Sequence, residues 1–264
     1  MQAVVARELL TVARSRASLV LFAGVSLVTF GMVLATGTQP NYLPTAVDLL
    51  LPMELLVPAV AIALGYKTIA ADDRRGELAV LNTYPLPTWG YVLGVYIGRA
   101  IAFAVIVGLP LALLGLYIST QSPDELAQIA THQGVDTPIV FVRFLVLTLL
   151  FGFTVLAMAL AASAIARSRR SALVVGIAVL VLVVVGLDLL LVRGFVGDWI
   201  ADDQLTSALA LSPTSAYRGL VFETVISAAT ETELRQASAA LSAIGLAVWG
   251  VGSLLLAVVM TARR

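Results

Sequence analysis

Long apolar runs alternate with short polar segments along the whole chain. A membrane-crossing helix needs about 20 mostly apolar residues, and it satisfies its own backbone hydrogen bonds in lipid. Six runs meet this requirement: Ala17–Ala35, Leu49–Tyr66, Ala100–Ile118, Phe144–Ile165, Ala172–Val192 and Ala239–Met260. The pattern therefore predicts an all-α integral membrane protein with six transmembrane helices, in which the first run is an uncleaved span. Residues 1–264 read as one membrane domain, without internal repeats.

Composition agrees with this pattern. Hydrophobic residues make up 60% of the 264 residues and charged residues 12%, whereas a soluble domain carries about 25% charged residues. The chain has no cysteine and one histidine, His132, so disulfides, thiolate metal sites and a histidine cluster are excluded. No metal site and no nucleic-acid partner are expected.

The distribution of basic residues predicts the orientation. Twelve of the sixteen lie on one side of the six spans: Arg7, Arg14, Arg16, Lys67, Arg74, Arg75, Arg99, Arg167, Arg169, Arg170, Arg263 and Arg264. Cytoplasmic loops carry the excess of arginine and lysine, so both termini are expected in the cytoplasm. One lysine against fifteen arginines is typical of a GC-rich prokaryotic genome, and we expect the plasma membrane of a prokaryotic cell.

Two segments outside the spans have patterns of their own. Within residues 1–16, Val5, Leu9 and Val12 fall on one helical face, which predicts an amphipathic helix lying in the inner interface. The segment 193–236 is too long for a simple turn, and its apolar spacing and cap residues predict short extracytoplasmic helices.

Three ionisable residues lie in or directly beside the expected spans, near their outer ends: Glu54, Arg143 and Asp188. Charges at membrane depth are costly and usually have a partner or a function. Arg143 could pair with either acid as a structural ion pair, or the three could line an outward-facing path. Gly90, Gly94 and Gly98 are four residues apart, which predicts close packing of another helix.

The cytoplasmic connection 67–99 has the most distinctive pattern. Four charges, Asp72 to Arg75, precede Leu78, Leu81 and Tyr84, which recur at helical spacing. Pro85 and Pro87 then stop the helix. This predicts a short amphipathic helix on the inner face. The chain has no G-x-x-x-x-G-K-[ST] phosphate loop, so it is not expected to bind ATP or to be an enzyme.

This connection resembles that of the membrane subunits of type-2 ATP-binding-cassette (ABC) exporters. The resemblance rests on the charged stretch Asp72–Arg75, on Gly76-Glu77-Leu78, on Leu81 and Pro85, and on the re-entry Leu93-Gly94. Six spans, cytoplasmic termini and the large last external loop extend it over the whole chain. Within this family, the chain is similar to the separate-permease branch typified by the nitrous-oxide-reductase maturation permease. Glu77 departs from the Thr of many relatives, and Val95 from their Lys.

The resemblance implies a mechanism and partners. The helix between spans 2 and 3 would be a coupling helix held in a cleft of a separate ATPase, which would carry ATP and Mg²⁺. The implied contact residues are Asp72, Asp73, Arg74, Arg75, Gly76, Glu77, Leu78, Leu81, Tyr84 and Pro85. A second permease subunit, identical or a paralogue, would complete the path.

Two other functions fit the same pattern. A secondary transporter or channel would need inverted repeats or charges near the midplane, and neither is evident. A membrane anchor that transmits mechanical work to an extracytoplasmic partner would use the segment 193–236, and this hypothesis is compatible with the first.

Overall fold

The computed structural model describes residues 1–36, 41–78, 87–121, 136–197, 199, 205–227 and 238–264. Within these ranges every regular element is a helix, and the six longest and most apolar stretches have the length and composition of membrane spans. They are Arg16–Ala35, Tyr42–Arg74, Thr88–Gln121, Pro138–Ile165, Arg169–Val196 and Ala239–Ala262. Each contains most or all of one predicted run, so the prediction of six apolar helices is confirmed.

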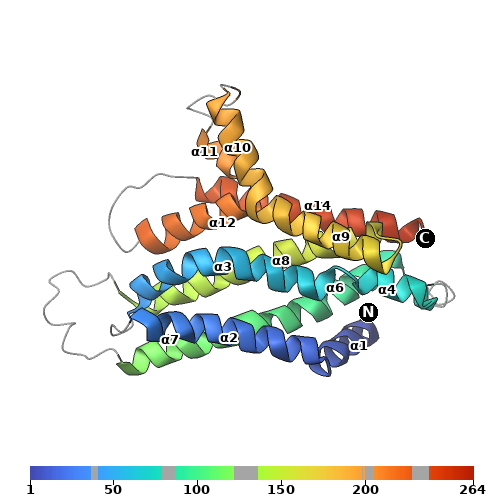
Figure 1. The fold of residues 1–264 in the computed structure, drawn as a ribbon, viewed down its shortest axis with the longest axis horizontal. Coiled ribbons are helices and arrows are strands. Elements are labelled where there is room, and N and C mark those ends of the chain that lie inside the picture. The colour runs from blue at the N-terminus through green and yellow to red at the C-terminus, as the bar shows by residue number, and fades with distance from the viewer. Residues whose placement is uncertain (37–40, 79–86, 122–135, 198, 200–204, 228–237) are drawn as a thin grey trace, which may run out of the picture.

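The spans form an elongated bundle (Figure 1). It comprises α2 (Arg16–Thr36), α3 (Tyr42–Gly65), α6 (Thr88–Phe103) continued by η1 (Ala104–Gly108) and α7 (Leu109–Gln121), α8 (Pro138–Ile165), α9 (Arg169–Val181) and α14 (Ala239–Ala262). Both chain termini lie at the same end of the bundle (Figure 1). We call this the terminal end and the opposite one the far end.

Several spans begin earlier than the apolar runs, for local chemical reasons. Helix α8 begins at Pro138, which needs no hydrogen-bond acceptor in the first turn. Helix α3 begins at Tyr42, where the Asp136 carboxylate accepts hydrogen bonds from the backbone N–H groups of Tyr42 and Leu43, at 3.1 and 2.7 Å. A carboxylate is favourable at a helix N-terminus because it satisfies free N–H groups and faces the positive end of the dipole.

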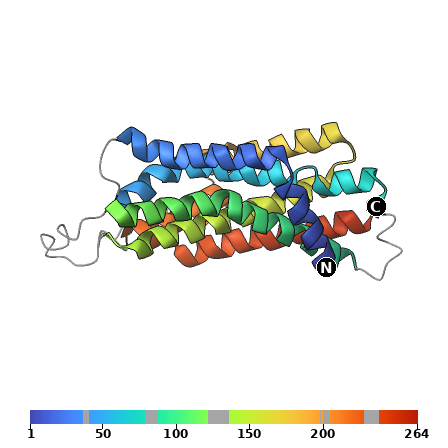
Figure 2. The same cartoon turned by 90° about the horizontal axis from the view of Figure 1, so that it is seen from below.

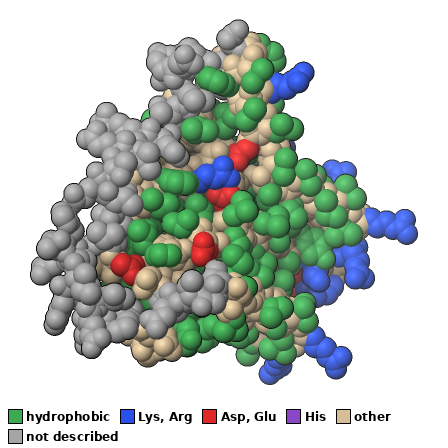
Figure 3. All heavy atoms as spheres, turned by 60° about the vertical axis from the view of Figure 1, so that its left-hand side comes forward, with side chains coloured by type: hydrophobic (Ala, Val, Ile, Leu, Met, Phe, Trp, Pro, Cys, Tyr) green, Lys and Arg blue, Asp and Glu red, His purple; other side chains and the backbone are tan. Residues whose placement is uncertain are grey.

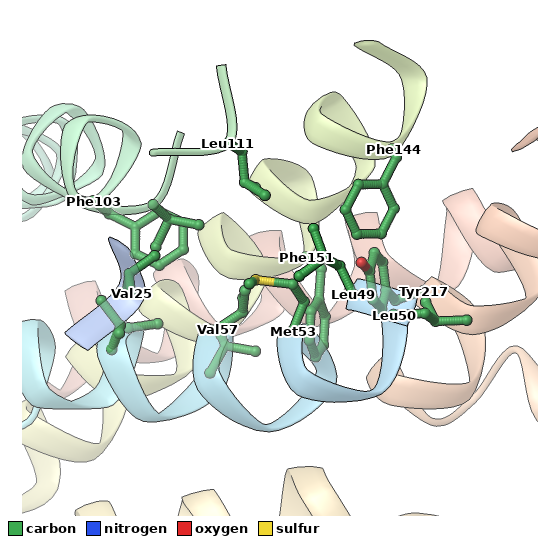
Figure 4. Packing of buried hydrophobic residues seen from close by; sticks show 14 of the residues in the cluster. Val25, Leu49, Leu50, Met53, Val57, Phe103, Leu111, Phe144, Phe151 and Tyr217 are labelled. Atoms are coloured by element: carbon green, nitrogen blue, oxygen red, sulfur yellow. The ribbon is translucent and has the colours of Figure 1, made fainter. Parts of the chain in front are cut away.

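Helix α8 is the centre of the packing, since it contacts α3 along one side and α14 along another. Phe144 and Phe151 of α8 are fully buried near Leu49 and Met53 of α3, and Phe103 of α6 belongs to the same buried cluster (Figure 4). By contrast, little of α9 and α14 is buried by the rest of the chain. Their apolar residues face outward, as expected for helices that contact lipid.

The fifth span is not straight. Its helix α9 continues through a π-helical turn, η3 (Leu182–Gly186), into α10 (Leu187–Val196). Beyond η3 the chain leaves the bundle, so that α10 and the short α11 (Leu205–Leu209) project from it (Figure 1). A π-turn inserts one residue into the ladder of i to i+4 hydrogen bonds, and such turns are a recognised cause of helix bends.

The first sixteen residues contain the separate helix that was predicted, α1 (Gln2–Ala13). It crosses the bundle obliquely at the terminal end (Figure 2) and packs on α6. Its buried face is Val4, Glu8 and Val12, whereas Val5 and Leu9 are only partly buried. The buried face of α1 thus differs from the predicted apolar face. It includes Glu8, because Arg99 of α6 is a partner for the Glu8 carboxylate.

The glycine face of α6 is what lets α1 approach. A Cβ atom added at Gly94 would lie 3.0 Å from the side chain of Val4, and one added at Gly98 would lie 2.6 Å from Cβ of Glu8. Real Cβ contacts are essentially never under 3.0 Å. The close packing predicted from the spacing of the glycines is therefore confirmed, and α1 is the helix that uses it.

The segment 193–236 contains part of the predicted secondary structure. Helices α11 and α12 (Pro213–Val221) lie in it, and α12 continues as the π-turn η5 (Phe222–Ile226). Helix α12 packs against α8 and α14 near the far end.

Candidate functional site

A network of charged side chains joins three helices at the terminal end. Its members come from α1, from α4 (Thr68–Arg74), from the residues that directly follow α4, and from α6. We define the terminal cluster as Arg7, Glu8, Asp72, Arg75, Glu77, Tyr91 and Arg99.

Asp72 is the centre of the terminal cluster. Its residue is 2% exposed, so its carboxylate depends on partners within the chain. Arg7 of α1 donates to Oδ2 at 2.6 Å and Arg75 donates to Oδ1 at 2.5 Å. The phenol of Tyr91 in α6 donates to Oδ2 at 2.7 Å. Because a buried carboxylate without partners would be strongly destabilising, these bonds hold α1, α4 and α6 at one point.

Glu8 makes a second connection between α1 and α6. It is also buried, and it accepts from Arg7 at 2.8 Å and from Nε of Arg99 at 2.7 Å. Burial by itself lowers the pKa of the Arg7 guanidinium, but the charges and hydrogen bonds of Asp72 and Glu8 outweigh it and raise that pKa above its ordinary value. Arg7 therefore stays charged at any physiological pH.

The C-terminal residue ties the same region to the rest of the bundle. Arg264 donates to Asp73 of α4 at 2.6 Å and to the backbone carbonyls of Ala164 and Ala166. In addition, the backbone N–H of Ala70 donates to the buried hydroxyl of Ser163 in α8. Helix α4 is thus bonded to α1, α6, α8 and the chain end.

The predicted coupling residues divide into four groups. Arg74, Arg75 and Gly76 are exposed, and Asp73 and Glu77 are partly buried. Asp72 and Leu78 are buried, Leu78 in a cluster that includes Val4 and Tyr91. Leu81, Tyr84 and Pro85 lie outside the described residues. Asp72 and Leu78 thus have partners inside the chain, and their contact with an ATPase stays a prediction.

Local backbone geometry separates α4 from the next helical turn. Helix α4 ends at Arg74, and Gly76 has a φ of +72°. Glycine is the residue that adopts this left-handed conformation at little cost, and it commonly ends helices. Residues 77 and 78 are helical again. The charged stretch Asp72–Arg74 consequently belongs to the helix that extends the second span, with the turn Arg75–Gly76 after it.

A second polar group lies near the far end and is built on α12. We define the far cluster as Glu54, Thr148, Phe151, Asp188, Ser212, Thr214, Ser215, Tyr217 and Arg218. Acidic and basic side chains occur together there within a largely apolar face, whereas Lys and Arg predominate toward the terminal end (Figure 3).

Arg218 of α12 and Glu54 of α3 form a bidentate ion pair. Nε and Nη2 of Arg218 donate to the two carboxylate oxygens of Glu54, at 2.7 and 2.5 Å. Glu54 is 5% exposed. The hydrogen bonds to Glu54 are the main cause that raises the pKa of Arg218 above its ordinary value, so this guanidinium also remains charged.

Helix α12 is bonded to two further spans. Ser212 and Ser215 both donate to Asp188 of α10, and Thr214 donates to the carbonyl of Val183 in the π-turn η3 at 2.7 Å. The Tyr217 ring stacks on Phe151 of α8, with centroids 4.8 Å apart and planes 6° apart. Burial raises the pKa of the Tyr217 phenol, which shares a hydrogen bond with Thr148 of α8.

The structure corrects the expected pairing of Arg143. Arg143 donates to the backbone carbonyl of Thr224 in η5 at 3.0 Å, while Arg218 occupies both oxygens of Glu54, and Asp188 accepts from serines. Glu54 is therefore in an ion pair, but with a residue outside the six spans. The error arose because an arginine brought in by a re-entering segment cannot be recognised from the hydropathy of the spans.

Other members of both clusters were also missed from sequence. Glu8 had a usable signal, since it is one acid in an otherwise basic segment and lies three and four residues from Val5 and Val4. The far cluster had a weaker one, the run Ser-Pro-Thr-Ser-Ala-Tyr-Arg at 212–218, which reads as an ordinary helix start. Among the described residues no three His, Cys, Asp or Glu side chains are arranged so that they could hold a metal ion.

Comparison with known proteins adds two findings. The family described as "ABC-2 family transporter protein" matches residues 2–264. A curated relative, the probable ABC transporter permease protein NosY of Stutzerimonas stutzeri, is 30% identical over 107 residues. That alignment covers 39% of this chain and 34% of the relative, so the chain spans about a third of the length of the curated relative it matches.

Proposed function

The chain belongs to the ABC-2 family of transporter proteins, as a multi-pass membrane permease subunit, and on this premise we propose that it couples ATP hydrolysis on a separate ATPase subunit to export of a substrate. The terminal end would face the cytoplasm, where the positive-inside rule places most of the basic residues. The chain itself would hold no nucleotide, since its sequence has no phosphate loop.

The observation that carries this proposal is the position of Asp72. It stands on α4, as the first residue of the segment expected to contact the ATPase, and it is bonded to Arg7 of α1 and Tyr91 of α6. Displacement of the segment would therefore be transmitted to two helices at once. A ligand or partner shifts a conformational equilibrium only through contacts that differ between the states, and in this proposal the contacts of the terminal cluster would be the ones that differ.

The exposed residues after Asp72 would make the contact itself. Arg74 is exposed, and the one hydrogen bond that its side chain makes to the described residues is to the carbonyl of Ala70 in its own helix. It can therefore engage a partner without breaking the terminal cluster. The second permease subunit, identical or a paralogue, would pack against the outward-facing apolar surface of the bundle, and the substrate path would lie between the two subunits.

Co-purification with the ATPase encoded beside the permease gene tests the proposal. We expect Arg74→Glu to reduce recovery of the ATPase while leaving the melting temperature of the isolated permease unchanged. Arg170→Glu is the matched control, because Arg170 is an exposed arginine at the same end, on α9, and it should leave recovery unchanged. The proposal fails if wild-type permease binds no cassette ATPase.

A second function is favoured by the far cluster. Helix α12 joins α3, α8 and α10 through Glu54, Phe151 and Asp188, so motion of the spans would reach the segment 193–236 and any extracytoplasmic partner bound there. This mechanical role is compatible with the first. The intact permease should then capture a periplasmic or extracellular protein. Loss of this capture on replacing Trp199, which is 79% exposed, with Ser would support the mechanical role.

A further inference from the structure

A cavity of about 250 Å³ lies inside the terminal cluster, between α1, α4 and the start of the third span. Its walls carry four basic residues, Arg7, Lys67, Arg75 and Arg99, and three acidic ones, Glu8, Asp72 and Glu77. The volume is below the roughly 300 Å³ at which pockets for drug-sized ligands begin. It suits a small polar group.

All the acceptor groups of the acidic residues are already occupied. Each of the six carboxylate oxygens of Glu8, Asp72 and Glu77 is bonded to an arginine. The cavity therefore has no carboxylate oxygen left for an incoming cation. A cation would have to displace an existing ion pair in order to bind.

Hydrogen-bond donors, in contrast, remain available. Lys67 has an exposed side chain, and its one interaction within the described part of the chain is with the ring of Tyr66, 5.7 Å from the ring centroid. Arg75 uses Nε and Nη2 in ion pairs, and Arg99 uses Nε and Nη1. One terminal nitrogen of each guanidinium is left, and the lining has a net formal charge of +1.

The depth of the cavity indicates where its ligand would come from. Lys67 directly follows the apolar run Leu49–Tyr66, and Arg99 directly precedes the run Ala100–Ile118. Basic residues at the ends of apolar spans lie at the level of the lipid headgroups. Beside the cavity residue Thr11, Leu10 of α1 is 55% exposed, which provides an apolar surface where acyl chains can lie.

We propose that this cavity binds a phosphate group, and that a membrane lipid headgroup supplies it. Lys67, Arg75 and Arg99 would donate to the phosphate oxygens, because these residues hold the unused donors. A bound phosphate would then link the end of α3, the turn after α4 and α6, and would strengthen the connections that the terminal cluster makes. The inference concerns the isolated permease and does not depend on coupling to an ATPase.

Lipid binding to the purified full-length permease tests the site directly. Native mass spectrometry and thermal unfolding in detergent would compare phosphatidylglycerol with diacylglycerol of the same acyl chains, which lacks the phosphate. We expect phosphatidylglycerol to bind and to raise the melting temperature, and diacylglycerol to do neither. Lys67→Gln removes a charged donor to the phosphate. Because hydrogen bonds to charged groups contribute strongly to binding, we expect the affinity to fall about tenfold or more.

Two controls distinguish the site from general attraction to basic protein. Lys67 takes part in no ion pair of the described chain, so Lys67→Gln should leave the melting temperature without lipid unchanged. Arg263→Gln removes a charge at the same end of the bundle, outside the cavity, and should bind phosphatidylglycerol as the wild type does. Equal weakening by both variants, or none by Lys67→Gln, would overturn the proposal.

A separate arm identifies the source of the phosphate. Inorganic phosphate is added at constant ionic strength in place of the lipid. No stabilisation by phosphate alone, with stabilisation by phosphatidylglycerol, supports the lipid headgroup. Stabilisation by phosphate alone that Lys67→Gln abolishes supports the phosphate site but overturns its lipid source. Equal effects of diacylglycerol and phosphatidylglycerol would show that the cavity recognises no phosphate.

Discussion

The two polar clusters at opposite ends of the bundle are built on different principles. The terminal cluster is a network in which three carboxylates share three arginines and a tyrosine. The far cluster has one bidentate ion pair, and its other contacts are hydroxyl hydrogen bonds and a stacked aromatic pair. One cluster borders a cavity, and the other includes the fully buried Tyr217 ring.

This difference has consequences for motion. In a network, a carboxylate that loses one arginine keeps another, so the helices can shift while most charges stay paired. A stacked, buried ring and a bidentate pair each have one good geometry, and close-packed interiors give little room for another. We therefore expect the terminal cluster to tolerate rearrangement and the far cluster to hold α12 rigidly against three spans.

Removing the Tyr217 ring should have the largest effect on stability. Tyr217→Ala deletes a fully buried ring stacked on Phe151, and large-to-small changes of buried aromatics cost about 3–5 kcal/mol. Tyr217→Phe keeps the ring and loses the bond to Thr148, which should cost only about 1 kcal/mol. Unfolding of the detergent-solubilised protein measures both. Similar losses for the two variants would show that the stacking does not hold the far cluster.

Breaking the far ion pair should come next. Arg218→Gln leaves the buried carboxylate of Glu54 without its partner. Because the Arg218 side chain is 42% exposed, solvent screens this pair, and we expect a loss of about 1–3 kcal/mol. The double variant Glu54→Gln with Arg218→Gln removes both charges and should recover part of that stability. If the single and double variants unfold alike, the pair is not coupled in the way the geometry indicates.

A similar or smaller effect is expected where α1 packs on the third span. Gly98→Ala places a Cβ atom 2.6 Å from Cβ of Glu8, and overpacking costs about 1–3 kcal/mol. Hydrogen exchange should then increase in residues 2–13, because α1 is pushed away from α6. Gly24→Ala is the control, since a Cβ atom there meets no other atom within 4 Å. Unchanged exchange in Gly98→Ala would mean that α1 does not depend on this contact.

Much of the fold could be predicted from hydropathy, because each membrane span must by itself be long enough and apolar enough to cross the lipid. The six apolar helices and the glycine face of α6 follow from rules that act within one segment or one helix pair. The start of α3 could not be predicted, since its N-terminal amides are capped by Asp136, more than ninety residues away.

The candidate sites were harder to predict because they depend on contacts between distant segments. Periodicity found the stretch Asp72–Arg75 and attributed it to contact with a partner, but burial turns the side chain of Asp72 inward toward Arg7 and Tyr91. Likewise, Glu54 was recognised as a charge that needs a partner. Its partner Arg218 lies 164 residues away, on a helix that returns to the bundle, and no local pattern specifies such a return.

The central claim, that Asp72 transmits motion from the ATPase contact to α1, has a direct test. A spin label at the exposed Leu10 of α1 would report its surroundings in the complex of permease and ATPase, before and after ATP is added. We predict a change with wild-type permease and with Asp73→Asn, whose aspartate bonds only to Arg264 among the described residues. Asp72→Asn should still bind the ATPase but show no change. An undiminished change in Asp72→Asn would contradict the account.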